Sequence, residues 1–125
     1  AIEKDENVIA MARLNPWSRE LFDNPKISQV MGDSSEEIGR FAAESFTGVI
    51  HDPPTMSLAG ELYSGEFYKQ VFRVLKRRGR MFHYLGDPNS ATGARVTKGV
   101  VRRLSDAGFR KVTILPAAFG VVACK

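Results

Sequence analysis

The chain has 125 residues, 43% hydrophobic and 26% charged, which suits one globular domain with a real core and excludes two such domains. The net charge of +4 is compatible with a nucleic-acid partner but does not require one. No apolar run reaches the roughly 18 residues of a membrane span, no secretion signal opens the chain, and the single cysteine excludes an internal disulfide, so we expect a cytoplasmic protein without a membrane partner.

Helical and extended patterns alternate along the chain, which predicts an α/β fold with helices on the faces of a mostly parallel sheet. In the first part, Asp5 is a plausible helix cap, Asn15 caps a short helix that begins at Pro16, and Asp33 or Ser34 caps a third helix. In chain order we expect a strand end at 1–3, helices at 6–14 and 16–22, a strand at 27–31 and a helix at 34–43.

The second part continues the alternation. Ser64 begins a strong helix with apolar residues at helical spacing, and its C-terminus carries Lys76 and Arg77, where cations are favoured. Residues 87–95 read as a loop, and Thr97 starts another helix. We expect strands at 47–52 and 80–86, helices at 65–76 and 97–108, and strands at 111–117 and 119–125. The last two strands are antiparallel neighbours because only a short link joins them.

The stretch "VIHDPPT", residues 49–55, ends an apolar strand on an acid and two prolines. Pro54 prevents the strand from continuing its ladder, and a following proline holds both Asp52 and Pro53 in extended geometry. The result is a stiff segment with a carboxylate at its base, which suits a substrate better than a core. His51 alternates to the opposite face from Asp52, and we expect it to be a packed, hydrogen-bonded residue.

The predicted strand order sorts the polar residues into two edges of the sheet. Ligands of open α/β sheets bind at the carboxyl ends of the strands. Glu3, Asp33 and Asp52 lie at such ends, as do residues 83–87. The basic cluster of residues 76–80 lies at the opposite edge and reads as a solvated turn. We therefore expect the three carboxylates to converge on one crevice.

Three short stretches with this order, "IEKDENV", "GDSSEE" and "VIHDPPT", together with the paired C-terminal strands, resemble the second half of class I S-adenosylmethionine-dependent methyltransferases. The chain is also similar to a group of uncharacterised archaeal predicted methyltransferases that carry the "HDPP" run. The resemblance implies a Rossmann-like fold and S-adenosylmethionine as cofactor. It implies that Glu3 accepts from the ribose hydroxyls, and that Asp33, with Ser34 beside it, accepts from the adenine amino group.

The resemblance also implies the reaction. Asp52, Pro53 and Pro54 match the catalytic segment of members that methylate amine nitrogens, in which the acid and a proline carbonyl hold the acceptor amine. Residues expected to contact the substrate follow this segment or end the next strand, namely Thr55, Glu61, Tyr63, His83 and Tyr84. The acceptor is a small molecule or a base of RNA or DNA. Thr55 argues against a flipped base, because this position usually carries an aromatic residue that stacks on it.

Two departures from the family concern the cofactor site. The chain has no glycine-rich turn after a first strand, and that central first strand is itself missing. We therefore expect the chain, as a single domain of residues 1–125, to be the C-terminal part of a longer methyltransferase-like domain that binds the cofactor poorly alone. The exposed strand edges beside the missing strand would favour a homodimer or another partner.

Two alternatives to methyl transfer remain open. The same sheet serves aminopropyl transfer to polyamines of the spermidine synthase type, in which acids such as Glu61 and Asp87 would surround the cationic substrate. The other alternative is a nucleic-acid-binding fragment without catalysis, which uses the basic surface. We expect no metal site, because no pair of candidate ligands has the usual close spacing.

Overall fold

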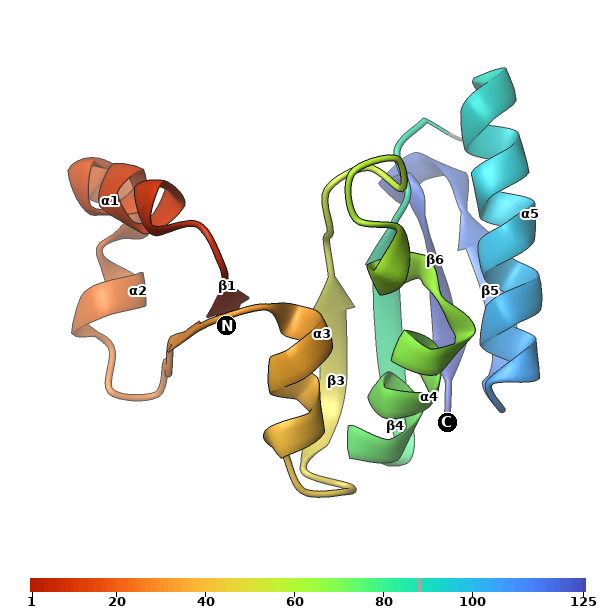
Figure 1. Cartoon of the computed structure of the whole chain (residues 1–125), viewed down its shortest axis with the longest axis horizontal. Coiled ribbons are helices and arrows are strands. Elements are labelled where there is room, and N and C mark those ends of the chain that lie inside the picture. Colours follow the sequence, from red (N-terminus) through yellow and green to blue (C-terminus); the bar gives the residue numbers. More distant parts are fainter. Residues whose placement is uncertain (88) are drawn as a thin grey trace. The chain divides into compact units, whose positions relative to one another are not determined.

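The computed structural model describes residues 1–87 and 89–125 and divides them into two compact units, Ala1–Arg40 and Phe41–Lys125 (Figure 1). Each unit combines strands with helices, so the α/β class predicted from the sequence is confirmed. The expectation that the whole chain forms one domain stays a prediction. No helix in the described ranges has the length and apolarity needed to cross a membrane.

The unit Ala1–Arg40 is built on two short parallel strands, β1 (Ile2–Glu3) and β2 (Val30–Met31). Both fall where strands were predicted, although β2 is shorter than the predicted range. Its helical elements are α1 (Glu6–Leu14), the 3₁₀ turn Pro16–Ser18, α2 (Glu20–Asp23), α3 (Ser34–Glu37) and the 3₁₀ turn Ile38–Arg40.

Short polar side chains start these helices as predicted. Asp5 accepts a hydrogen bond from the Asn7 backbone, and Asn15 accepts one from the Trp17 backbone. Asp33, rather than Ser34, caps α3. The predicted helix at 34–43 is wrong in its length: the α-helix ends at Glu37 and continues only as a 3₁₀ turn, which contains the poor helix former Gly39.

The unit Phe41–Lys125 contains a four-stranded sheet in the order β3-β4-β6-β5. The parallel pair is β3 with β4, and β6 pairs antiparallel with both β4 and β5. The antiparallel ending predicted from the short link is therefore confirmed. The strands are β3 (Phe46–His51), β4 (Leu75–Tyr84), β5 (Arg110–Leu115) and β6 (Gly120–Cys124).

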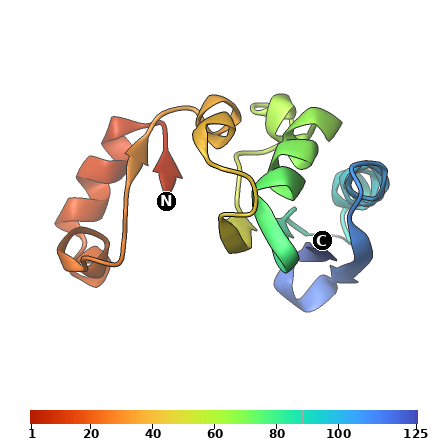
Figure 2. The same ribbon diagram turned by 90° about the horizontal axis from the view of Figure 1, so that it is seen from below.

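Both long helices of this unit, α4 (Gly65–Val74) and α5 (Ala91–Asp106), lie on the same face of the sheet (Figure 2). They bury the residues that alternate toward them, and Met81 and Val121 are completely buried. The opposite face carries Ile50, which is 83% exposed, and the half-buried Phe82, its neighbour across β4. The core of this unit therefore lies on one side of the sheet.

Two predicted helix boundaries in this unit are wrong. The helix after Ser64 ends at Val74, because Leu75 already pairs with Phe46 of β3, so Lys76 and Arg77 belong to β4 rather than to the helix C-terminus. Helix α5 starts at Ala91 and not at Thr97. Ser90 caps it by accepting from the Gly93 backbone, in a stretch whose glycine and asparagine had indicated a loop.

Candidate active site

The acid–proline–proline segment directly follows β3. Asp52 and Pro54 are exposed and Pro53 is half-buried, so the segment is accessible at the carboxyl end of the strand, as predicted. The hydroxyl of Tyr63 donates a hydrogen bond of 3.0 Å to the Pro54 carbonyl oxygen. This bond spans nine residues and fixes the conformation of a segment already stiffened by its prolines.

His51, the last residue of β3, lies beneath this segment. Its Nε2 lies 3.0 Å from the Leu62 carbonyl oxygen and therefore carries the proton that is donated there. Burial lowers the pKa of His51 from 6.5 to about 4, although the Leu62 carbonyl and Asp52 act in the opposite direction. The prediction of a packed, hydrogen-bonded histidine is confirmed.

His83 on β4 pairs in register with His51, and the two ring centroids are 4.4 Å apart. The side chain is completely buried, and its Nδ1 lies 3.3 Å from the Tyr68 hydroxyl. Burial, followed by the nearby His51 and Arg103, lowers the pKa of His83 to about 2. Its Nε2 has no hydrogen-bond partner within the described part of the chain. The histidine pair is therefore neutral and belongs to the packing under the segment.

Arg103 on α5 completes this buried cluster. Its Nε donates a hydrogen bond of 2.7 Å to the Tyr63 carbonyl oxygen. Helix α5 therefore positions Tyr63, whose hydroxyl donates to the Pro54 carbonyl oxygen. Sequence reasoning did not assign this structural role to Arg103. A signal for its structural role exists, because it follows Val100 by three residues and lies at the border of the buried stripe of α5.

The other residues expected to contact the substrate lie around the same edge of the sheet. Thr55 and Glu61 are exposed, and the Thr55 hydroxyl is 3.0 Å from that of Ser57. Tyr84 alternates to the helix-free face and is 41% exposed, whereas Tyr63 and His83 are buried. Their roles as substrate contacts stay predictions.

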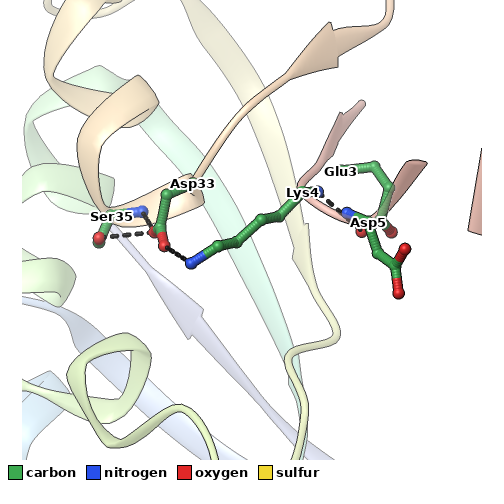
Figure 3. A network of polar contacts seen from close by, with 5 residues as sticks. All are labelled: Glu3, Lys4, Asp5, Asp33 and Ser35. Atoms are coloured by element: carbon green, nitrogen blue, oxygen red, sulfur yellow. Dashed lines mark hydrogen bonds and ion pairs between the residues drawn. The ribbon is translucent and has the colours of Figure 1, made fainter. Parts of the chain in front are cut away.

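In the other unit, Glu3 ends strand β1 and Asp33 lies two residues after its parallel partner β2, and Lys4 connects the two acids (Figure 3). Glu3 Oε1 accepts from the backbone N–H groups of Lys4 and Asp5, at 2.7 and 2.8 Å. The Lys4 ammonium, in turn, forms an ion pair of 2.7 Å with Asp33. The structure therefore brings together two of the three acids that the sequence placed at strand ends.

Asp33 uses both of its oxygens within the chain. Oδ2 pairs with Lys4, and Oδ1 accepts from the backbone and the hydroxyl of Ser35 (Figure 3). The hydrogen bond to Lys4, followed by those to Ser35, lowers the pKa of the Asp33 carboxyl to about 2. Asp52 belongs to the other unit, and the convergence of all three carboxylates on one crevice stays a prediction.

Of the residues that were predicted to bind the cofactor, Glu3 is best suited to its role, which is to accept hydrogen bonds from the ribose hydroxyls. It uses Oε1 for its own loop, and no hydrogen bond to Oε2 occurs within the described residues. Asp33 accepts from Lys4 at Oδ2 and from Ser35 at Oδ1, and each carboxylate oxygen can accept a further hydrogen bond, so an adenine amino group could bind beside Lys4 or in its place. The Lys4 side chain is 75% exposed and the Asp33 side chain 23% exposed.

Comparison with known proteins finds two relatives by sequence and several solved structures of similar fold. No family model matches the chain. It is 51% identical over 125 residues to the uncharacterized protein MJ1233 of Methanocaldococcus jannaschii, covering 99% of this chain and 43% of that protein. It is 34% identical over 83 residues to a polyamine aminopropyltransferase of Aeropyrum pernix, covering 62% of this chain and 26% of that protein. The chain thus spans less than half the length of these relatives.

Two solved structures have a similar fold over almost the whole chain. A spermidine synthase in complex with the transition-state analogue AdoDATO matches with a TM-score of 0.77 and 25% identity, over 98% of this chain and 44% of that one. A SAM-dependent methyltransferase from Archaeoglobus fulgidus matches with a TM-score of 0.69 and 12% identity, over 99% of this chain and 74% of that one. The fold is that of the Rossmann-like methyltransferases. Spermidine synthase shares it.

Proposed function

We propose that the chain is part of an enzyme that transfers an alkyl group from an S-adenosyl sulfonium donor to an amine nitrogen. The observation that carries this proposal is the exposed carboxylate of Asp52 at the carboxyl end of β3, followed by two prolines whose conformation Tyr63 fixes. An acceptor amine needs such a rigid hydrogen-bond acceptor, because a misplacement of about 1 Å can cost on the order of a hundredfold in rate.

In this proposal Asp52 and the Pro53 carbonyl accept the hydrogens of a neutral amine and direct its lone pair away from the segment. The Pro54 carbonyl is engaged by Tyr63 and serves the geometry of the segment instead. The donor, when bound, supplies an electrophilic carbon attached to a positively charged sulfur. The nitrogen–carbon bond forms as the carbon–sulfur bond breaks, and its electron pair neutralises the sulfur. The proton lost from the nitrogen leaves to Asp52 or to water.

The cofactor assignment is part of the same proposal. Glu3 would bind the ribose hydroxyls, while Asp33 and the neighbouring Ser34 would bind the adenine. A carboxylate with a free oxygen is suited to accept from hydroxyl groups, which supports the role of Glu3.

Two donors fit this chemistry. The aminopropyl donor of polyamine synthesis is supported by the 34% identity to an aminopropyltransferase and by the likeness to spermidine synthase. The exposed acids Glu61 and Asp87 at the same edge as Asp52 suit a cationic amine substrate. Methyl transfer from S-adenosylmethionine to an amine of a small molecule, RNA or DNA is the second candidate. The acid–proline–proline signature and the methyltransferase fold favour it.

The test uses the whole protein that contains this chain. It is incubated with a polyamine such as spermidine and with either S-adenosylmethionine or its decarboxylated form, and the product mass identifies the transferred group. Asp52→Asn keeps the size of the side chain but removes its charge, and we expect it to abolish turnover while the protein stays folded. Full turnover by Asp52→Asn, or no product from either donor across a panel of amines, would contradict the proposal.

We further propose that residues 1–125 form the C-terminal part of one methyltransferase-like domain in a cytoplasmic protein. Three observations support this proposal. The chain covers only 43% of its relative from Methanocaldococcus jannaschii. In the sheet described, β3 has a strand on one side only, and Ile50 is exposed on the face without helices. It predicts weak binding of S-adenosylmethionine to the isolated chain, and submicromolar binding in calorimetry would contradict it.

The unpaired edge of β3 also favours a homodimer, which a monomeric sedimentation coefficient would exclude.

A further inference from the structure

The unit Phe41–Lys125 carries six exposed cations at the edge of its sheet opposite Asp52. We name this set the basic edge. Its members lie at the amino end of β4 and in β5, which runs antiparallel to β6 beside β4. They are Lys76, Arg77, Arg78, Arg80, Arg110 and Lys111. The sequence alone had indicated a solvated turn at 76–80 and had not connected it with residues 110 and 111.

A bulge in β4 brings the first cations outward. The register advances from Phe46 to Gly48 in β3 while it advances from Leu75 to Arg80 in β4, so three extra residues leave the ladder. Arg78 adopts a left-handed backbone with φ of 65°. Residues other than glycine rarely adopt this backbone conformation, and it persists only where the surrounding structure imposes it.

A second bulge exposes a cation from β5. The register changes between Arg110 and Thr113, and Lys111, with φ of 49°, is the second basic residue with a left-handed backbone. Arg80 and Arg110 both pair in register with Cys124 of β6, so they flank it on one face of the sheet. Bulges redirect side chains near functional sites, and here both of them present positive charge at the same edge.

Acidic side chains do not neutralise this edge. Within the described ranges, none of the six cations forms an ion pair. Asp106, four residues before Arg110, pairs with Arg102 at 3.8 Å, and Glu44, whose backbone N–H donates to the Arg73 carbonyl, pairs with Lys125 at 3.6 Å. A concentrated, unpaired positive field is the requirement for binding a polyanion.

We propose that the basic edge binds the sugar–phosphate backbone of a nucleic acid. Four of its six members are arginines, whose planar guanidinium groups match phosphate oxygens. An acidic protein is the alternative occupant that this charge would attract, and a comparison of RNA with polyglutamate distinguishes the two. The proposal is independent of the alkyl-transfer function.

The position of the edge also restricts what a bound nucleic acid does. Gly48 pairs with Arg80 and lies four residues before Asp52. This places the basic edge about 13 Å or more along the strand from the acid–proline–proline segment. The nucleotide whose phosphate is bound at this edge is therefore not the one that reaches Asp52. The edge recruits or localises the protein on a nucleic acid.

The test compares two triple variants that lose the same charge. Arg77→Gln, Arg80→Gln and Arg110→Gln together remove half of the basic edge, whereas Arg95→Gln, Lys98→Gln and Arg102→Gln remove three exposed cations of α5. Binding of a labelled oligouridine RNA is followed by fluorescence anisotropy as the salt concentration rises. Removing three phosphate contacts should reduce the slope of log K against log salt by about 2 and weaken binding by about tenfold or more.

We expect the α5 variant to keep the wild-type slope. Equal losses in the two variants, no loss in either, no salt-dependent RNA binding by the wild type, or stronger binding of polyglutamate than of RNA would each overturn the proposal. Circular dichroism checks folding. If the first triple variant unfolds, Arg110→Gln alone is used, with an expected slope change of about 0.7.

Discussion

The stability of the unit Phe41–Lys125 should fall steeply as the pH drops from about 6.5 toward 5, because it buries His51 and His83 in the neutral form. These are the chain's two histidines. In the unfolded chain both would protonate near their ordinary pKa of 6.5, whereas in the folded unit burial lowers these pKa values to about 4 and about 2. Below pH 6.5 the unfolded state therefore binds more protons and is favoured.

The magnitude follows from the linkage between protons and folding. At pH 5 each neutral histidine destabilises the unit by about 2 kcal/mol relative to pH 7.5, or about 4 kcal/mol for the pair. The slope well below pH 6.5 approaches about 2.7 kcal/mol per pH unit. The contribution of His51 levels off near pH 4, where the folded state also binds its proton. Carboxyl groups ordinarily titrate lower and the α-amino group higher, so this window isolates the histidines.

Urea unfolding at several pH values, followed by near-ultraviolet circular dichroism of the tyrosines, measures this dependence. His51→Gln serves as the matched control, because the amide still donates to the Leu62 carbonyl but does not titrate, and it should halve the slope. An unfolding free energy that stays constant between pH 6.5 and 5, or an unchanged slope in the control variant, would refute the reasoning.

Three further predictions concern single side chains. Tyr63→Phe removes the hydroxyl that fixes the acceptor segment and should lower the unfolding free energy by about 1 kcal/mol, whereas Tyr84→Phe, at an exposed position, should leave it unchanged; equal melting temperatures would contradict this. Gly120→Ala would drive its Cβ into a backbone carbonyl of β4 and should destabilise the chain by more than about 1 kcal/mol in urea titrations, unlike Gly60→Ala, whose Cβ meets no atom. Asp33→Ala removes the cap of α3 and should lower the unfolding free energy by about 1 kcal/mol, whereas Asp33→Asn keeps the cap and should lower it less. An equal loss of stability in thermal melts of the two variants would argue against capping.

Local chemistry made much of the fold predictable from the sequence. The caps at Asp5, Asn15 and Ser64 and the short link between the last two strands each depend on neighbouring residues, and each was confirmed. The start of α5 was missed because a single hydroxyl, that of Ser90, outweighed the breakers around it. Local signals of similar strength competed at that position.

The candidate site was predictable only in outline. The exposure of Asp52 and the packing of His51 followed from strand alternation. The bonds that hold the segment, from Tyr63 to Pro54 and from Arg103 to Tyr63, join residues nine and 40 positions apart. No periodicity encodes such contacts, because they depend on where α5 docks. The bulge that carries Arg78 was likewise hidden, since its glycine and cations resemble an ordinary helix end.

The way in which the helices begin has an evolutionary consequence. One short polar side chain starts each of α1, α3, α4 and α5, so the start of each helix depends on a single position rather than on its whole length. Mutational drift in the exposed interior of such helices leaves their boundaries intact. Substitutions that spare Asp5, Asp33, Ser64 and Ser90 can therefore accumulate in these helices without moving the residue at which each helix begins.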